Sequence, residues 1–246
     1  MEKEIQADET EASGTIRWPD FVSGSLIKRY KRFLADVRLD TGEIVTAHCP
    51  NSGSMKTCAT PDQRVFLSLH DSPKRKLKYT WELIETSGSL VGVNTAIPNR
   101  LVKTAIENGK IAPLSGYDTV TAEVKTGEHS RLDLLLRKKG RADCFVEVKN
   151  CTLVQEGDAS FPDAVTERGR KHLVELQDLA RAGNRAVMFF LIQRMDARFF
   201  HPADDIDPAY GQELRKAHKN GVEILVYDVD ITLSRIAIRS AVPFSL

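Results

Sequence analysis

Short runs of alternating apolar and polar residues fill the chain from about residue 16 to residue 86. This period-two pattern is typical of strands with one buried face. It predicts strands at residues 25–39, 43–49, 64–70 and 76–86, with 89–95 as a further candidate. Asp40-Thr41-Gly42 has the composition of a hairpin turn, and Pro50 to Thr60 reads as a longer loop. Short strands without an intervening helix predict a small β-barrel of the OB type.

From residue 87 onward the pattern alternates between helices and strands. Helical periodicity marks residues 98–109, 163–182 and 207–219, and strands are predicted at 118–125, 131–136, 144–150, 185–194, 222–230 and 235–240. This order predicts a mixed sheet flanked by helices. The chain is therefore divided into a tail (1–15), an OB-like domain (16–86) and an α/β domain (87–246).

The long helix predicted at residues 163–182 has one apolar stripe. At 100° per residue the stripe contains Val165, Leu173, Leu176, Leu179 and Ala180. Arg168 and His172 lie one turn apart at its edge, where a side chain can extend over the sheet toward an active face. A helix flank with salt bridges is the competing interpretation.

Basic and aromatic residues share one face of the first predicted strand. Phe33, Ala35, Val37 and Leu39 alternate as an inward set, which leaves Lys28, Tyr30 and Arg32 on the other side. Such a stripe is typical of surfaces that follow a phosphate backbone and stack bases, although Tyr30 covering a barrel edge is an equal alternative. Lys74, Arg75 and Lys76 add positive charge, whereas Tyr79 and Trp81 share parity with leucines and are predicted in the core.

The stretch "CFVEVKNCT", residues 144–152, places an acid and a base inside a core strand. Residues i and i+2 of a strand point to the same face, so Glu147 and Lys149 lie together, opposite Val146 and Val148. The preceding strand carries Asp133 seven residues before Gly140, and Glu147 lies seven residues after it. A hairpin centred on Gly140 therefore places the two carboxylates opposite each other, with an apolar face of Leu132, Leu134, Leu136, Cys144, Val146 and Val148 behind them.

Two opposed carboxylates repel each other unless a cation offsets their charge. Mg²⁺ typically takes one or two carboxylates and completes its shell with water and substrate phosphate. A lysine beside such a site can position water or neutralise charge on a phosphate. An Asp followed after a turn by Glu-x-Lys is the motif of PD-(D/E)xK nucleases, and a charged ladder on a solvated sheet face is the alternative.

Composition narrows the function classes only slightly. The 246 residues are 41% hydrophobic, which is enough for a sizeable core, and the net charge of +1 does not by itself indicate a polyanion partner. Residues 1–15 carry five acids and one lysine, which predicts a mobile acidic tail, while residues 16–85 carry twelve basic and eight acidic residues. The four cysteines form no CxxC pair, so a structural zinc site is not expected. Without a signal peptide or membrane-spanning run, we expect a cytoplasmic protein with no membrane partner.

Several long strings give the chain a family resemblance. "HCPNSGSM", "RKLKYTWELI", "VGVNTAIPNRLV", "SRLDLLL", "FVEVKNCTL", "FPDAVTERGRKHLVEL" and "GVEILVYDVDI" together resemble the sugar fermentation stimulation protein A family from about residue 17 to the C-terminus. The resemblance implies a DNA-binding protein with an N-terminal OB-like domain and a C-terminal PD-(D/E)xK nuclease-like domain. The name of the family comes from a proposed regulatory role in maltose metabolism.

The resemblance also supports particular residues. It implies Asp133 and Glu147 as metal ligands and Lys149 as the catalytic lysine. In the nuclease hypothesis below, the backbone carbonyl of Val148 is a further metal ligand. Further active-site candidates, whose surrounding strings match, are Glu123, Ser130, Arg131, Thr152, Arg168 and His172.

Two hypotheses follow for the function. The first is a nuclease that depends on Mg²⁺ or Mn²⁺ bound together with DNA, in which Arg168 or His172 grips phosphate. The second is a DNA-binding regulator of sugar metabolism that keeps the nuclease fold as a scaffold. The sequence leaves the oligomeric state and the preferred nucleic acid open.

Overall fold

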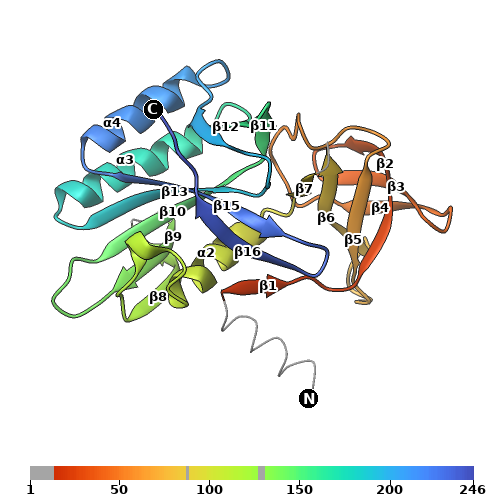
Figure 1. Ribbon diagram of the computed structural model, residues 1–246, viewed down its shortest axis with the longest axis horizontal. Coiled ribbons are helices and arrows are strands. Elements are labelled where there is room, and N and C mark those ends of the chain that lie inside the picture. Colours follow the sequence, from red (N-terminus) through yellow and green to blue (C-terminus); the bar gives the residue numbers. More distant parts are fainter. Residues whose placement is uncertain (1–13, 87–88, 127–130) are drawn as a thin grey trace.

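The computed structural model describes residues 14–86, 89–126 and 131–246. Figure 1 shows a β-barrel formed by the early strands beside a larger α/β part. The predicted mobile tail falls outside the described residues apart from Gly14 and Thr15. Among the helices in the described ranges, none combines the length and the apolar character that crossing a bilayer requires.

Strands β2 to β6 close into a barrel. Their bounds are Phe21–Tyr30 (β2), Leu34–Leu39 (β3), Ile44–His48 (β4), Arg64–Leu69 (β5) and Tyr79–Thr86 (β6). They pair in the order β4-β3-β2-β5-β6, and parallel pairing of β4 with β6 closes the ring. Alternate residues such as Val37, Leu67 and Trp81 fill the interior. The predicted small barrel and the core position of Trp81 are confirmed.

The strand predicted at residues 25–39 is wrong, because the chain reverses in its middle. β2 ends at Tyr30 and β3 begins at Leu34, with Tyr30 paired to Leu34. Lys31 and Arg32 in the turn have positive φ angles of 47° and 65°. Arg32 therefore leaves the stripe that it was expected to share with Lys28 and Tyr30. Phe33 lies at the barrel rim and is 45% exposed, so it does not belong to the inward set.

The α/β part is built on a mixed sheet. Its order is β1-β16-β15-β13-β10-β9-β8, with bounds Thr15–Arg17 (β1), Arg235–Ala241 (β16), Glu223–Ile231 (β15), Arg185–Ile192 (β13), Cys144–Cys151 (β10), Arg131–Arg137 (β9) and Thr119–Lys125 (β8). β10, β13 and β15 are parallel, and the remaining neighbours are antiparallel. The continuous apolar run of β13 follows from its central position, where helices cover both faces.

Helices cover the two faces of this sheet. α2 (Ile97–Glu107) packs on one face together with the short 3-10 helix η1 (Ala112–Leu114), and α3 (Glu167–Arg181) and α4 (Pro208–Lys219) pack side by side on the other (Figure 1). A small sheet of β11 (Leu153–Gln155), β12 (Asp158–Phe161) and β14 (Phe199–Pro202) lies near the barrel. The prediction of a mixed sheet flanked by helices is confirmed.

α3 starts later than the predicted residue 163. Thr166 is the N-cap and its hydroxyl accepts a hydrogen bond from Gly169 N, so the helix begins at Glu167. Val165 consequently lies outside the helix and is 69% exposed, contrary to its expected place in the apolar stripe. Leu173 and Leu176 of that stripe are buried against the sheet, as expected.

The sheet pairings do not follow the predicted domain limits at two points. β1 belongs to the α/β sheet, where it pairs with β16. β7 (Ser89–Gly92) pairs with β6, so the barrel sheet extends past residue 86 to Gly92. The division into residues 16–86 and 87–246 stays a prediction, but each sheet takes one strand from beyond that division.

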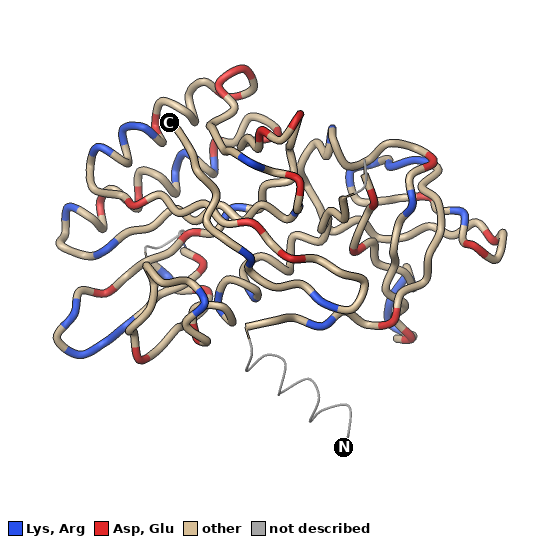
Figure 2. The backbone as a smooth tube through the Cα atoms, in the orientation of Figure 1, with Lys and Arg blue, Asp and Glu red and all other residues tan. Residues whose placement is uncertain are grey.

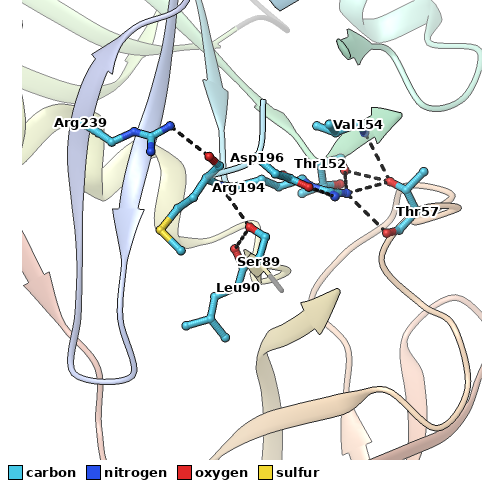
Figure 3. A network of polar contacts seen from close by, with 9 residues as sticks. Thr57, Ser89, Leu90, Thr152, Val154, Arg194, Asp196 and Arg239 are labelled. Carbon is cyan, nitrogen blue, oxygen red and sulfur yellow. Dashed lines mark hydrogen bonds and ion pairs between the residues drawn. The ribbon is translucent and has the colours of Figure 1, made fainter. Parts of the chain in front are cut away.

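A polar network joins the barrel to the α/β part (Figure 3). The guanidinium of Arg194 donates to the hydroxyl of Thr57 in the barrel and to the carbonyl of Thr152 after β10, at 3.1 Å in both cases. It also forms a two-bond ion pair with Asp196. The hydroxyl of Thr57 donates to the carbonyl of Thr152. The barrel is therefore fixed to the strand end that follows Lys149.

Charged residues of both signs are interspersed along both parts of the chain (Figure 2). This distribution agrees with the net charge of +1. Any contact with a polyanion must therefore depend on local groups of cations rather than on the overall charge.

Candidate active site

The β9–β10 hairpin has the register counted from Gly140. Cys144 pairs with Leu136 and Val146 with Leu134. The regular pairing ends there, and the next link is made by a side chain: Val148 N donates to Asp133 Oδ2 at 2.8 Å. Asp133 is therefore fixed at the edge of β10, beside the strand that carries Glu147 and Lys149.

One residue of the expected apolar face is on the wrong side. Leu132 packs with Leu173 and Met188 in the core under α3, whereas Leu134 and Leu136 pack in the core under α2. The side chains of β9 before and after Asp133 therefore point to opposite faces, where regular alternation predicts the same face. The Asp133 side chain itself accepts a hydrogen bond from the backbone of Val148. Glu123, which lies between the paired positions opposite Asp133, has a positive φ of 56°. Both strands are thus distorted at this level, which parity counting does not foresee.

Glu147 is the most enclosed charged group of the site, with 2% of its surface exposed. Its Oε1 accepts a hydrogen bond from Lys149 Nζ at 2.6 Å and also contacts Nδ1 of His172 from α3. Its Oε2 is buried and has no hydrogen-bond partner among the described residues. One carboxylate oxygen is thus held by two basic side chains, and the other is left to bind something else.

The two carboxyl groups have opposite pKa shifts. Burial and the nearby charge of Glu147 raise the pKa of Asp133 to about 6, against the hydrogen bond from Val148 and the charge of Lys149. Burial also raises the pKa of Glu147, but the hydrogen bond with His172 and the charge of Lys149 outweigh it and hold that pKa below its usual value. The pair therefore has one carboxylate that stays ionised at low pH and one that takes up a proton as the pH falls through about 6.

Asn99 completes the surroundings of Asp133. From the first turn of α2 it donates from Nδ2 to Asp133 Oδ1 at 2.7 Å. Sequence reasoning missed this residue, because an Asn at a helix start is an ordinary residue and its partner is 34 positions away. The string "VGVNTAIPNRLV" was the only signal that drew attention to this segment.

The other predicted site residues are spread more widely. Arg131 and Glu123 form an exposed ion pair with each other at 3.2 Å. Thr152 is buried in the joint with the barrel, and Arg168 is exposed in the first turn of α3. Ser130 lies outside the described residues. His172 is buried against Glu147, so it is placed to hold that carboxylate, and phosphate contact by Arg168 or His172 stays a prediction.

The predicted nucleic-acid contacts fall into two groups. Lys28, Tyr30 and Arg32 line a hollow of about 290 Å³, where Lys28 lies over the Tyr30 ring and 3.7 Å from Asp36. Lys74, Arg75 and Lys76 lie in the turn between β5 and β6. Arg75 donates to Thr80, and both lysines are exposed. The residues described as lining the hollow include none of this second group.

The donor set suits a hard cation with few protein ligands. In the described part of the chain no cluster of three or more His, Cys, Asp or Glu side chains could enclose a metal. Mg²⁺ needs only one or two carboxylates, and Asp133 together with the unpartnered Oε2 of Glu147 supplies that number. The residues therefore fit Mg²⁺ or a similar ion and do not fit structural zinc.

Two sequence profiles and several relatives match this chain. The profile described as the sugar fermentation stimulation protein RE domain matches residues 96–235, and that of the SfsA N-terminal OB domain matches residues 27–93. A sugar fermentation stimulation protein homolog from Geobacter sulfurreducens is 57% identical over 221 residues, covering 90% of this chain and 94% of the relative. Another from Geotalea uraniireducens is 61% identical over 203 residues, covering 82% of this chain and 87% of that relative.

A solved structure has the same fold over nearly the whole chain. The structure of Pyrococcus furiosus SfsA in complex with Ca²⁺ matches with a TM-score of 0.85 and 27% sequence identity, covering 94% of this chain and 98% of that one. The barrel, the mixed sheet and the helices are thus shared with a protein of the same name as the relatives. The chain belongs to the sugar fermentation stimulation protein family.

Proposed function

We propose that this protein binds nucleic acid and hydrolyses phosphodiester bonds with a divalent cation, Mg²⁺ or Mn²⁺. Two observations on the carboxylates carry the proposal. Asp133 and Glu147 are close enough for their charges to interact, and the buried Oε2 of Glu147 has no hydrogen-bond partner in the described residues. Most buried polar atoms in proteins have a hydrogen-bond partner, so an ionised carboxylate oxygen without one is a reasonable ligand for a cation.

Each side chain has a distinct task in this proposal. Asp133 and Glu147, with the carbonyl of Val148, hold the cation, which neutralises negative charge on the phosphate. Lys149 positions the attacking water and stabilises developing charge from its place beside Glu147. Asn99 and His172 keep the two carboxylates oriented.

The comparisons support parts of this proposal. The Pyrococcus furiosus relative is in complex with Ca²⁺, an ion that prefers the same oxygen ligands as Mg²⁺. The profile match to an OB domain supports nucleic acid as the partner, because this barrel commonly binds oligonucleotides.

A non-enzymatic DNA-binding regulator is the second candidate. One observation favours it: Oε1 of Glu147 is already held by Lys149 and His172, as in a closed ion-pair network. The deciding experiment is a cleavage assay of the full chain on single- and double-stranded DNA, with Mg²⁺ and Mn²⁺ titrations. Folded protein that binds DNA and cleaves neither substrate with either ion would leave the regulator as the better description.

Cation binding should weaken as the pH falls through about 6. The pKa of Asp133 is raised to about 6, so below that pH the carboxyl must lose a proton before it binds an ion, and affinity falls about tenfold per pH unit. With DNA present, we expect added Ca²⁺ to raise the unfolding midpoint clearly above that of the same mixture in EDTA at pH 7.5, and hardly at pH 5. Differential scanning calorimetry checks this, and equal rises at both pH values would contradict it.

In the metal-free protein, the Asp133 carboxyl should make the free energy of unfolding fall as the pH rises. The folded state holds the Asp133 proton more tightly than the unfolded chain, where the pKa is near 3.8. The ionised carboxyl therefore lowers the free energy of unfolding progressively between about pH 4 and pH 6, and the added ion removes that loss.

Neutralising basic residues of the barrel should weaken DNA binding for all sequences alike. For each of Lys28, Arg32, Lys74 and Arg75 that binds a phosphate, neutralisation should reduce the slope of log affinity against log salt by roughly one unit. Glutamine variants measured by fluorescence anisotropy between low and high salt test this, with Lys216→Gln on α4 as control. If the slope stays unchanged, these residues do not bind phosphate.

A further inference from the structure

A polar crevice lies between the barrel and the carboxyl end of β10. It has a volume of about 270 Å³. One wall is the barrel loop Asn51–Gly53, and the other is the segment 161–166 that leads into α3. Asn150 of β10 forms part of its lining. In open α/β sheets ligands bind outside the carboxyl ends of the strands, and this crevice has that position.

Two walls of the crevice lead directly to the candidate active site. Asn150 follows Lys149 in β10, and Thr166 caps the helix that carries His172. The side chains of Asp133, Glu147 and Lys149 are not among those that line the crevice. It is therefore a neighbouring subsite and not the metal site itself.

The barrel loop also separates the crevice from the basic hollow beside Lys28. Ser54 lines that hollow together with Arg29 and Arg32, while Asn51, Ser52 and Gly53 line the crevice. The loop is held on both sides, so the two spaces have a rigid common wall. A chain-like ligand passing over residues 51–54 would occupy both spaces in succession.

Two charged side chains hold this wall. Arg29 donates to the carbonyl groups of Asn51, Gly53 and Ser54 at 2.8 to 3.2 Å. On the other side Asp163 accepts hydrogen bonds from Ser54 Oγ and Met55 N, both at 3.2 Å. Gly53 permits this approach, because an added Cβ would lie 2.5 Å from Asp163 Oδ2.

The depth of the active site limits the form of the substrate. Glu147 and His172 are buried, and the side chain of Lys149 is only 15% exposed. The crevice reaches Asn150, the neighbour of Lys149 in β10, and its volume of about 270 Å³ suits a single backbone better than a duplex. The basic hollow offers a cation over an aromatic ring, Lys28 over Tyr30, and aromatic rings bind the faces of unpaired bases.

We propose that the crevice and the basic hollow form one track, passing over residues 51–54, for a single unpaired nucleic-acid strand that leads its phosphate to Lys149. This inference rests on the proposed function for its destination, but the track itself binds without catalysis. The Arg194 network fixes the barrel to β10, so the track is present before the strand binds.

Acidic substitutions at opposite walls test the track. Ser52→Glu and Val165→Glu each add a negative charge to the crevice from an exposed position. Val174→Glu adds the same charge on the outer face of α3, where Val174 is 44% exposed and does not line the crevice. Anisotropy of labelled single strands and duplexes is measured with EDTA present, so that cleavage plays no part.

We expect wild-type protein to bind the single strand at least about tenfold more tightly than the duplex of the same sequence. Ser52→Glu and Val165→Glu should each weaken single-strand binding roughly three- to tenfold, with Val174→Glu within about twofold of wild type. The track is refuted if duplex binds as tightly as single strand, or if both crevice variants, shown to be folded by circular dichroism, match Val174→Glu.

The binding test separates this inference from the proposed function. Selective single-strand binding that is sensitive to Ser52→Glu upholds the track even if no cleavage occurs with Mg²⁺. Cleavage of duplex DNA that is insensitive to both crevice variants upholds the hydrolytic function and overturns the track.

Discussion

Replacing Lys149 with methionine should reduce Mg²⁺-dependent cleavage by about a thousandfold or more, with the protein still folded. The ammonium group stabilises charge that develops on the phosphate and positions water, and such contributions are typically worth about 10²- to 10⁴-fold each. Asp133→Ala and Glu147→Ala should be equally inactive, because either change removes a cation ligand. The measurement is the single-turnover cleavage rate at saturating Mg²⁺.

The three residues should act as a unit. Double variants among them should be little worse than single ones, since a site that has lost its cation gains nothing from an intact lysine. Lys216→Met, an exposed lysine of α4, is the matched control and should keep the wild-type rate. DNA affinity in chelator should be unchanged or slightly tighter for Asp133→Ala and Glu147→Ala, because each removes a charge that repels phosphate. A Lys149→Met protein that cleaves at the wild-type rate would exclude this lysine from the reaction.

The placement of Asp133 beside the strand of Glu147 could be predicted from sequence because it depends on local geometry. Counting from Gly140 was enough to bring Asp133 beside the strand of Glu147, since hairpin register is set by the turn and by alternation. The same rule failed at Leu132, because the Asp133 side chain replaces a backbone contact of the sheet. Side chains alternate between the two faces of a strand only where its backbone hydrogen bonds to the neighbouring strand are regular.

Turns without glycine were harder to predict. The reversal between β2 and β3 uses Lys31 and Arg32 at positive φ angles, where Gly or Asn would have been expected. With neither residue present, the alternating pattern continued unbroken through the turn and was assigned to one strand. The exposed position of Phe33 and the role of Arg29 in holding residues 51–54 followed only from the structure.

Contacts between residues far apart in the chain could not be predicted from the sequence. Asn99 binds Asp133, Asp163 binds the barrel loop, and β1 pairs with β16 near the other end of the chain. Each is an ordinary residue or segment whose partner is chosen by the tertiary fold. Family resemblance marked the strings that contain Asn99 and Asp163, but it did not say which residues they contact.

Arg194→Met should lower the free energy of unfolding by about 3 kcal/mol, or about 6 to 12 °C in the unfolding midpoint. Arg194 is 4% exposed and its guanidinium satisfies the carbonyl of Thr152, the hydroxyl of Thr57 and the carboxylate of Asp196. Methionine fills a similar volume but leaves these acceptors without their donor in a buried joint. Urea denaturation followed by tryptophan fluorescence measures the change.

The matched control for Arg194→Met is the same substitution at an exposed arginine. Arg181→Met removes an arginine that is 61% exposed and paired with Asp178 on the surface of α3, so it should change stability by less than about 0.5 kcal/mol. Because Thr152 comes three residues after Lys149, loosening the joint in Arg194→Met should also lower the cleavage rate.

A double-mutant cycle with Thr57→Val separates the joint from a general loss of packing. The Thr57 hydroxyl accepts from Arg194 and donates to the carbonyl of Thr152, so both residues act on the same acceptor. Once Arg194 is gone, removing the hydroxyl should cost less than it does in the wild-type protein, with a coupling of about 1 kcal/mol or more. Additive effects of the two substitutions would mean that Arg194 stabilises the α/β part alone and does not fix the barrel to the strand that carries Lys149.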